Sequence, residues 1–245
     1  MAKKDQFVIA YLTDLTESKT VVSHAAFFAN KLAKGLILLH ISDPRYTKVT
    51  PDEAEHYLKS ICNDIRNPKS QTSLPCPSCT YAALKGDSKQ LLSSLPTVMN
   101  ALLIVAQVSP LSRRNSPMNR RNLLRDFADC RAAYLVVQQP LPAHGYDDVA
   151  MVVDFKKESK DKFIWSSYFP RFVGSRMHIL YYDYKDAFLH GKWYANMQQL
   201  HKLYSTLELS DALFHVIPSK STFPDVNALD FVSRQGYGLL ICVTT

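Results

Sequence analysis

Four arginines in one polar stretch of the sequence are the residues best suited to hold an anion. Arg113, Arg114, Arg120 and Arg121 follow an apolar run that is typical of a buried strand. Anions bind at the carboxyl ends of parallel strands, and guanidinium groups hold phosphate through paired hydrogen bonds. The alternative is a solvated loop whose charges serve only solubility. We favour this alternative, because runs of charge in loops are usually solvated.

Two aspartates occupy matching places in the sequence. Asp14 and Asp154 each stand at the end of an apolar run that is typical of a strand. Such a carboxylate could coordinate a metal beside a nucleotide, or it could take part in the turn into the next helix. Aspartate is common where a strand passes into a helix, so we favour the turn and predict no metal site.

Cys76 and Cys79 have the spacing of half a zinc site or of a redox pair. A zinc site needs four ligands, and no second pair of this kind follows in the sequence. Redox pairs normally open a helix, whereas Pro77 disfavours helix at the residue before it. We favour a pair without chemical function, and a dithiol switch is the alternative.

Apolar runs alternate with segments of helical periodicity, which predicts an α/β fold with parallel sheets. The capping residues Thr50 and Glu53 predict the start of one helix, and Gly35 and Gly174 are expected to end two others in the left-handed conformation. The runs that predict strands are 7–12, 36–41, 80–84, 101–106, 133–137, 149–153, 178–182, 212–217 and 238–243.

The pattern of strands and helices starts again after a proline-containing linker, which indicates an internal repeat. We therefore predict a first domain over 1–138, a linker over 139–147 and a second domain over 148–245. The second domain lacks counterparts of the last helix and last strand of the first. Its sheet should have four strands, and an unpaired edge beside the fourth strand invites pairing with another chain. We therefore expect a dimer or higher oligomer formed through that edge, or an edge that the first domain covers.

Composition narrows the class of protein. The chain has 245 residues, 47% of them hydrophobic, and a formal net charge of +7, which permits an anionic partner without requiring one. Five scattered cysteines do not resemble a secreted disulfide framework. No apolar run approaches the ~20 residues of a membrane span, and no signal peptide precedes the first strand. These features predict a cytoplasmic protein without a membrane partner.

Two copies of a β-α-β-α-β-α-β pattern, each with an aspartate after its first strand, resemble the universal stress protein family. The matching stretches include 8–14, 29–33, 38–41, 86–87, 103–105 and 130–137. The resemblance implies two doubly wound parallel-sheet domains in tandem, of UspA type. It also implies the strand order 3-2-1-4-5, with the second copy ending after its fourth strand.

Members of that family that bind ATP carry the pattern G-x2-G-x9-G-[ST] after the fourth strand. Glycines there let the backbone approach the phosphates. This chain has no glycine between Gly86 and Gly145, so the pattern is absent. The resemblance therefore implies that no cofactor binds, with ATP the alternative, and that Asp14 and Asp154 are remnants of a degenerate nucleotide site.

The resulting functional expectation is a universal stress protein-like, non-catalytic stress-response protein that acts through assembly or partner binding. The first alternative is a nucleotide-binding protein that uses the arginines at 113, 114, 120 and 121, with weak ATP hydrolysis as the enzymatic version. The second alternative is a nucleic-acid-binding module that uses the same arginines. We do not expect nucleic acid as a partner.

Overall fold

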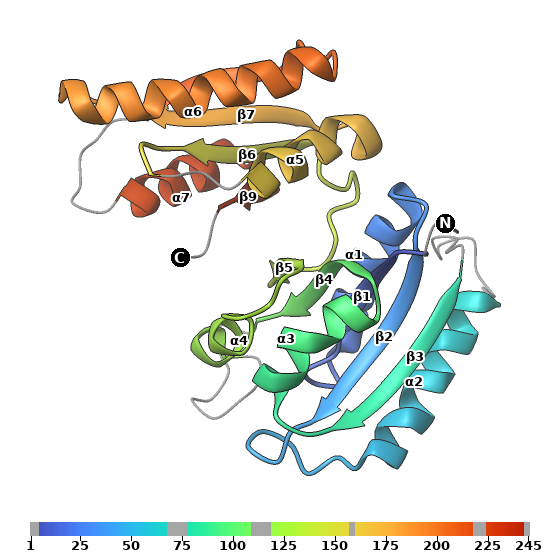
Figure 1. Cartoon of the computed structure of the whole chain (residues 1–245). Helices are drawn as coiled ribbons and strands as arrows, with labels where there is room; N and C mark the ends of the chain where they lie inside the picture. Colours follow the sequence, from blue (N-terminus) through green and yellow to red (C-terminus); the bar gives the residue numbers. More distant parts are fainter. Residues whose placement is uncertain (1–4, 68–77, 109–118, 157–159, 218–223, 243–245) are drawn as a thin grey trace. The chain divides into compact units, whose positions relative to one another are not determined.

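The protein divides into two compact units, Met1–Leu141 and Pro142–Thr245, and every strand pair in either unit is parallel. Figure 1 labels most of the helices and strands of both units. The computed structural model describes residues 5–67, 78–108, 119–156, 160–217 and 224–242.

The first unit holds a five-stranded sheet in the order β3-β2-β1-β4-β5. Right-handed crossovers place α1 and α2 on one face of such a sheet and α3 and α4 on the other, as Figure 1 shows. The strands are β1 (Phe7–Tyr11), β2 (Gly35–Ser42), β3 (Cys79–Lys85), β4 (Ala101–Gln107) and β5 (Ala133–Val137), and the helices are α1 (Ser18–Lys31), α2 (Pro51–Arg66), α3 (Ser88–Val98) and α4 (Arg120–Asp126).

The core of the first unit explains why its strands read as unbroken apolar runs. Ile9, Ile37 and Ile104 lie on the face that packs against Leu92 of α3 and Leu123 of α4. The intervening residues of β1 and β2 are also buried, on the opposite face. A central parallel strand covered on both sides has no position for a solvated side chain.

The second unit holds a four-stranded sheet in the order β8-β7-β6-β9. This order corresponds to that of the first four strands of the first unit, β3-β2-β1-β4, and the predicted fold class is confirmed. The elements are β6 (Asp148–Val153), α5 (Lys160–Tyr168), a π-helical turn (Phe169–Val173), β7 (Arg176–Tyr182), α6 (Ala187–Thr206), β8 (Leu213–Ile217), α7 (Pro224–Gln235) and β9 (Leu239–Ile241).

The predicted helix ends were correct at one glycine and wrong at the other. Gly174 is left-handed, with φ 85°, and follows the π-helical turn as expected. In α1 the left-handed residue is Ala33, with φ 51°, and Gly35 is the first residue of β2. Gly35 meets a packing constraint instead, because a Cβ there would lie 2.6 Å from the Phe7 ring.

The predicted capping box of α2 is confirmed. Thr50 Oγ1 accepts a hydrogen bond from the backbone N–H of Glu53 at 3.3 Å, and Glu53 Oε2 accepts one from the backbone N–H of Thr50 at 2.8 Å. These bonds satisfy two N–H groups that a helix start would otherwise leave unpaired.

Helices of the described part of the chain are too short or too polar to cross a membrane. The longest, α6, has 20 residues. It carries Lys192, Lys202 and several other polar side chains, whereas a spanning helix needs ~20 predominantly apolar residues.

Gly35→Ala should destabilise the first unit, because the added methyl group would overlap both the Phe7 ring and the Ser78 hydroxyl, each 2.6 Å away. We expect a loss of about 1–3 kcal/mol in the free energy of unfolding, measured by urea denaturation with far-ultraviolet circular dichroism.

The matched control is Gly191→Ala in α6, where a Cβ would meet nothing within 4 Å. It should raise the free energy of unfolding by roughly 0.5–1 kcal/mol, because alanine is the better helix former. Equal effects of the two substitutions would show that Gly35 is not held by packing.

Candidate functional site

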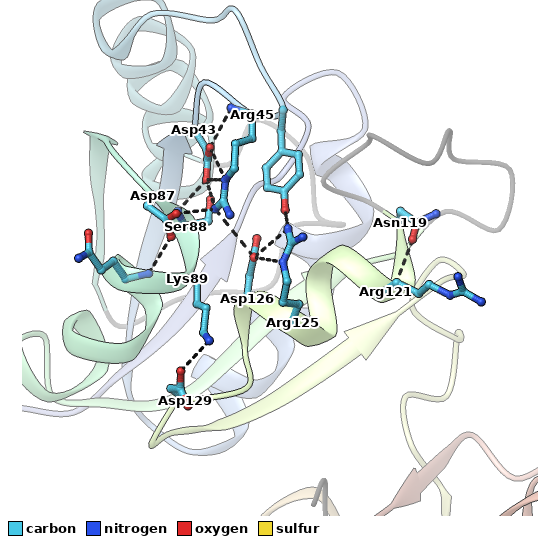
Figure 2. Close-up of polar contacts among 12 residues, drawn as sticks. Asp43, Arg45, Asp87, Ser88, Lys89, Asn119, Arg121, Arg125, Asp126 and Asp129 are labelled. Atoms are coloured by element: carbon cyan, nitrogen blue, oxygen red, sulfur yellow. Dashed lines mark hydrogen bonds and ion pairs between the residues drawn. The ribbon is translucent and has the colours of Figure 1, made fainter.

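Charged side chains gather at the carboxyl end of the first sheet, which is where ligands bind in folds of this kind. Asp43 follows β2, Asp87 follows β3, and Arg125 and Asp126 end α4. Figure 2 shows these side chains pointing toward one another, with Arg45 among them. We call Asp43, Arg45, Asp87, Arg125 and Asp126 the carboxylate–arginine cluster.

Asp43 is the most deeply buried acid of the cluster, with 2% of its side chain exposed. Its carboxylate accepts a hydrogen bond from the backbone N–H of Ser88 at 2.8 Å. It also accepts bonds from the backbone N–H of Arg45 at 2.9 Å and from Nη2 of that residue at 2.5 Å. Burial alone would raise the pKa of Asp43, but the bonds from Arg45 and Ser88 outweigh it and hold the pKa well below its usual range.

Arg45 joins three segments that are distant in the sequence. Its Nη2 lies 2.5 Å from Asp43 Oδ2, 3.2 Å from Asp87 Oδ2 and 4.0 Å from Asp126 Oδ1. The hydrogen bond with Asp43 raises the pKa of Arg45, so the guanidinium remains charged. Arg45 therefore ties the end of β2 to the start of α3 and to the end of α4.

Asp126 is buried with fewer partners. Its side chain is 4% exposed, and its closest cation is the adjacent Arg125, with Nε at 3.4 Å from Oδ1. Burial raises the pKa of Asp126 even though Arg45 and Arg125 oppose the shift. Arg125 also donates to the Tyr46 hydroxyl, and the Arg45 guanidinium lies 5.1 Å from the centroid of the Tyr46 ring.

Asp87 and the polar side chains next to the cluster make further hydrogen bonds and ion pairs within the first unit. The Tyr11 hydroxyl, at the end of β1, donates to Ser88 Oγ at 3.2 Å, and burial raises the pKa of Tyr11 so that it stays protonated. Asp87 caps α3 by accepting from the backbone N–H of Gln90 at 3.0 Å. Lys89 pairs with Asp129 at 3.0 Å.

The charge balance of the cluster does not suit an anionic ligand. Three carboxylates, Asp43, Asp87 and Asp126, face two guanidiniums, Arg45 and Arg125, so no positive charge is left over for a phosphate. A metal site is not indicated either, since the described ranges contain no group of three or more His, Cys, Asp or Glu residues that could hold an ion. The arrangement is suited to clamping three chain segments together.

The two predicted aspartates take part in turns. Asp14 Oδ1 accepts hydrogen bonds from the backbone N–H of Thr16 at 2.8 Å and from its hydroxyl at 2.7 Å. Asp154 Oδ1 accepts from the backbone N–H of Lys156 at 2.8 Å. These are the local bonds of an Asx turn, which aspartate commonly makes after a strand.

Of the four predicted arginines, the two that the structure describes do not join the carboxylate–arginine cluster. Arg120 and Arg121 are the first residues of α4, and both are exposed. Asn119 Oδ1 accepts from the Arg121 backbone N–H at 3.0 Å, and Figure 2 shows the Arg121 side chain extending away from the carboxylates. Within the described residues, no hydrogen bond or ion pair joins Arg120 or Arg121 to Asp14. Arg113 and Arg114 lie outside the described residues.

The cysteine pair is only partly described. Cys79 is the first residue of β3 and is buried, with 3% of its surface exposed. Its partner in the sequence motif, Cys76, lies outside the described residues. Burial makes Cys79 a poor candidate for thiol chemistry, which needs an accessible thiolate.

Sequence reasoning missed the carboxylate–arginine cluster, although one signal was available. Asp43 comes two residues after a buried apolar run, as Asp14 does, and an arginine follows two residues later. No comparable signal marks Asp126, which stands in a charged helical segment far along the chain. Its burial follows only from the packing of α4.

Structural comparison places the chain among known folds. It is similar to a universal stress protein from Archaeoglobus fulgidus, with a TM-score of 0.64, 13% identity, and coverage of 97% of this chain and 86% of that one. It is also similar to a putative universal stress protein from Pseudomonas aeruginosa, with a TM-score of 0.64, 11% identity, and coverage of 98% and 81%. A functionally unknown protein from Pseudomonas aeruginosa matches with a TM-score of 0.64, 10% identity, and coverage of 97% and 81%. These similarities show a universal stress protein-like fold.

Comparison of sequences finds less. No protein-family model matches the chain, and no curated protein matches it significantly. The likeness therefore resides in the arrangement of strands and helices.

Loss of charge should destabilise the protein much more at Asp43 than at Asp126. Asp43→Asn removes the acceptor of several charge-assisted bonds and should lower the free energy of unfolding by roughly 2–3 kcal/mol at pH 7. Asp126→Asn removes a poorly paired buried charge and should change it by less than about 1 kcal/mol. Urea denaturation measures both.

The pH dependence of this difference supplies the control. The pKa of Asp43 is lowered in the folded state, so its stabilisation is present above the unfolded pKa of about 3.9 and is lost as the pH falls further. The gap between wild type and Asp43→Asn should therefore shrink between about pH 4 and pH 2. The pKa of Asp126 is raised, so protonation of Asp126 on acidification should favour the folded state. A gap for Asp43→Asn that does not depend on pH would contradict its role as a charged partner of Arg45.

Proposed function

We propose that this chain is a universal stress protein-like, non-catalytic stress-response protein that acts through assembly or partner binding. The fold, which is similar to that of universal stress proteins, supports the relationship. The observation that carries the non-catalytic part of the proposal is the position of Arg45, which bridges three carboxylates at the edge of the sheet where a ligand would bind.

A nucleotide would find little to hold its phosphates at this edge. Phosphate sites are built from backbone N–H groups, usually on glycines, or from unpaired arginine and lysine side chains. The chain has no glycine between Gly86 and Gly145. The guanidiniums of Arg45 and Arg125 are already bound to carboxylates and to Tyr46. We infer that the nucleotide site is degenerate.

The second sheet supports assembly, because both of its outer strands pair on one side only within the described residues. β9, beside which the sequence predicted an open edge, has three residues, whereas β8 has five. Leu213, Phe214 and Val216 of β8 are 46%, 42% and 53% exposed. An apolar edge strand is a template for pairing with another strand.

We infer that the occupant of this edge is β8 of a second copy. Two identical strands can pair antiparallel about a twofold axis, and each then satisfies the free N–H and C=O groups of the other. The exposed side chains Leu213 and Val216 would be covered in both copies at once. No Asp, Glu, Lys or Arg lies within β8 to oppose this contact.

Addition of ATP with Mg²⁺ should leave the melting temperature unchanged at millimolar concentration, because the cluster offers no free cation to the phosphates. A ligand present at 100 times its Kd would add ~2.7 kcal/mol to the stability of the folded state, so binding would be readily detected. If a shift appears, the double variant Arg113→Ala and Arg114→Ala tests the alternative arginine site. Loss of the shift in that variant would replace our proposal with the nucleotide-binding one.

Val216→Lys should weaken self-association, because a charge on β8 would be buried without a partner in the paired edge. Light scattering should show a dimer for wild type and a Kd raised at least about tenfold for the variant, which corresponds to ~1.4 kcal/mol.

The control for the edge is Val98→Lys at the end of α3, where the valine is 71% exposed. This variant should dimerise as wild type does. A strictly monomeric wild-type protein would remove the assembly part of the proposal.

A further inference from the structure

A second polar arrangement lies in the other unit, toward the amino-terminal end of its sheet. It links Asp148 of β6 to His178 of β7 and His178 to His215 of β8. His178 Nε2 lies 2.8 Å from Asp148 Oδ1, and His178 Nδ1 lies 2.9 Å from His215 Nε2. The three side chains therefore form one hydrogen-bonded chain across three adjacent strands.

Hydrogen-bonding rules fix where the protons lie when both rings are neutral. Asp148 can only accept, so His178 Nε2 carries the proton and donates it. A neutral His178 then has a bare Nδ1, which accepts, so His215 must donate from Nε2. The remaining nitrogen, His215 Nδ1, then carries no proton.

The chain can take up one proton without losing a bond. In one arrangement His215 gains a proton on Nδ1 and still donates from Nε2. In the other, His178 is doubly protonated and donates both to Asp148 and to a bare His215 Nε2. A second proton would place N–H groups on both facing nitrogens, and the bond between the histidines would break.

The groups packed around the pair do not supply a counter-charge to His215. The Tyr237 ring stacks on His178 with centroids 4.0 Å apart, and the Phe231 ring of α7 lies 5.6 Å from that of His215. Asp148 is the one carboxylate in this hydrogen-bonded series of three side chains. It is shared between His178 and Arg176, whose Nη2 lies 2.9 Å from Asp148 Oδ2. The charged residues of α7 nearest in sequence to Phe231, Asp230 and Arg234, pair with each other at 3.3 Å.

We propose that Asp148, His178 and His215 form a pH-sensitive latch that holds the edge strand β8 against β7 at neutral pH and releases it on acidification. Below a pH of about 6.5, two separated imidazoles each bind a proton, whereas the latched pair holds at most one. Opening of the latch is therefore accompanied by proton uptake, and acid favours the open form.

The direction of the titration of His215 agrees with this sign. Burial, followed by the proximity of His178, lowers the pKa of His215. A histidine whose pKa is lowered in the folded state contributes stability above the unfolded value of about 6.5 and loses it as the pH falls. The strand that is released, β8, carries the exposed side chains of Leu213, Phe214 and Val216. Release of β8 would therefore remove this apolar edge from the sheet.

Hydrogen exchange of the β8 amides, Leu213–Ile217, tests the latch in the full chain. Protection of these amides, corrected for intrinsic exchange, should fall about tenfold per pH unit below pH 6 for each extra proton taken up on opening. His215→Gln keeps a side-chain N–H donor but removes one of the two rings that can bind a proton, so its protection should depend less steeply on pH than that of wild type. His144→Gln, which removes an exposed histidine of the same unit, should behave as wild type does.

Protection in wild type that does not change between pH 7.5 and pH 5, or an unchanged fall in His215→Gln, would overturn the latch. Nitrogen-15 NMR of the histidine rings gives a second measurement that does not depend on any variant folding. At pH 7.5 it should show protonated Nε2 and bare Nδ1 on both His178 and His215. A proton on His178 Nδ1 at that pH would also overturn it. Light scattering separately reports on assembly, so failure of the dimer would leave this test intact.

Discussion

Burial of the Asp43 carboxylate is the constraint on which the first unit depends. A charge removed from water is costly unless hydrogen bonds and an opposite charge replace its hydration. Here the replacement comes from Arg45 and from the backbone N–H of Ser88, which opens α3. The position of α3 relative to β2 is thereby tied to the ionised state of one side chain, and α4 is tied to the same arginine through Asp126.

The same edge of a doubly wound sheet can serve a ligand or serve the fold, and the chemistry of the loops decides between them. Flexible loops with free N–H groups leave the strand ends open to a phosphate. Loops that carry side chains able to neutralise one another close that edge from within. Asp43, Arg45 and Asp87 belong to the second type, since each has its partner inside the cluster.

Sequence reasoning was most successful where one local rule decides the outcome. Unbroken apolar runs predicted the central strands, and Thr50 with Glu53 predicted a helix start, because both depend on residues close in sequence. Gly35 was misassigned because a contact with Phe7, on another strand, determines its role. For the same reason, the sequence did not reveal the carboxylate–arginine cluster or the histidine pair of the second sheet. Their partners are brought together only by the order of strands in the sheet.

The reach of Arg45 has a consequence for how the first unit is made on the ribosome. The residues it bridges are Asp43, Asp87 and Asp126, so the cluster cannot be complete until the chain has been synthesised beyond α4. Asp43 can pair earlier, because Arg45 lies two residues away and Ser88 opens α3. The contact of Arg45 with Asp126 of α4 is the last to become possible. Nascent chains of this unit should therefore remain incompletely packed at that end, whatever native contacts β1 and β2 have already formed.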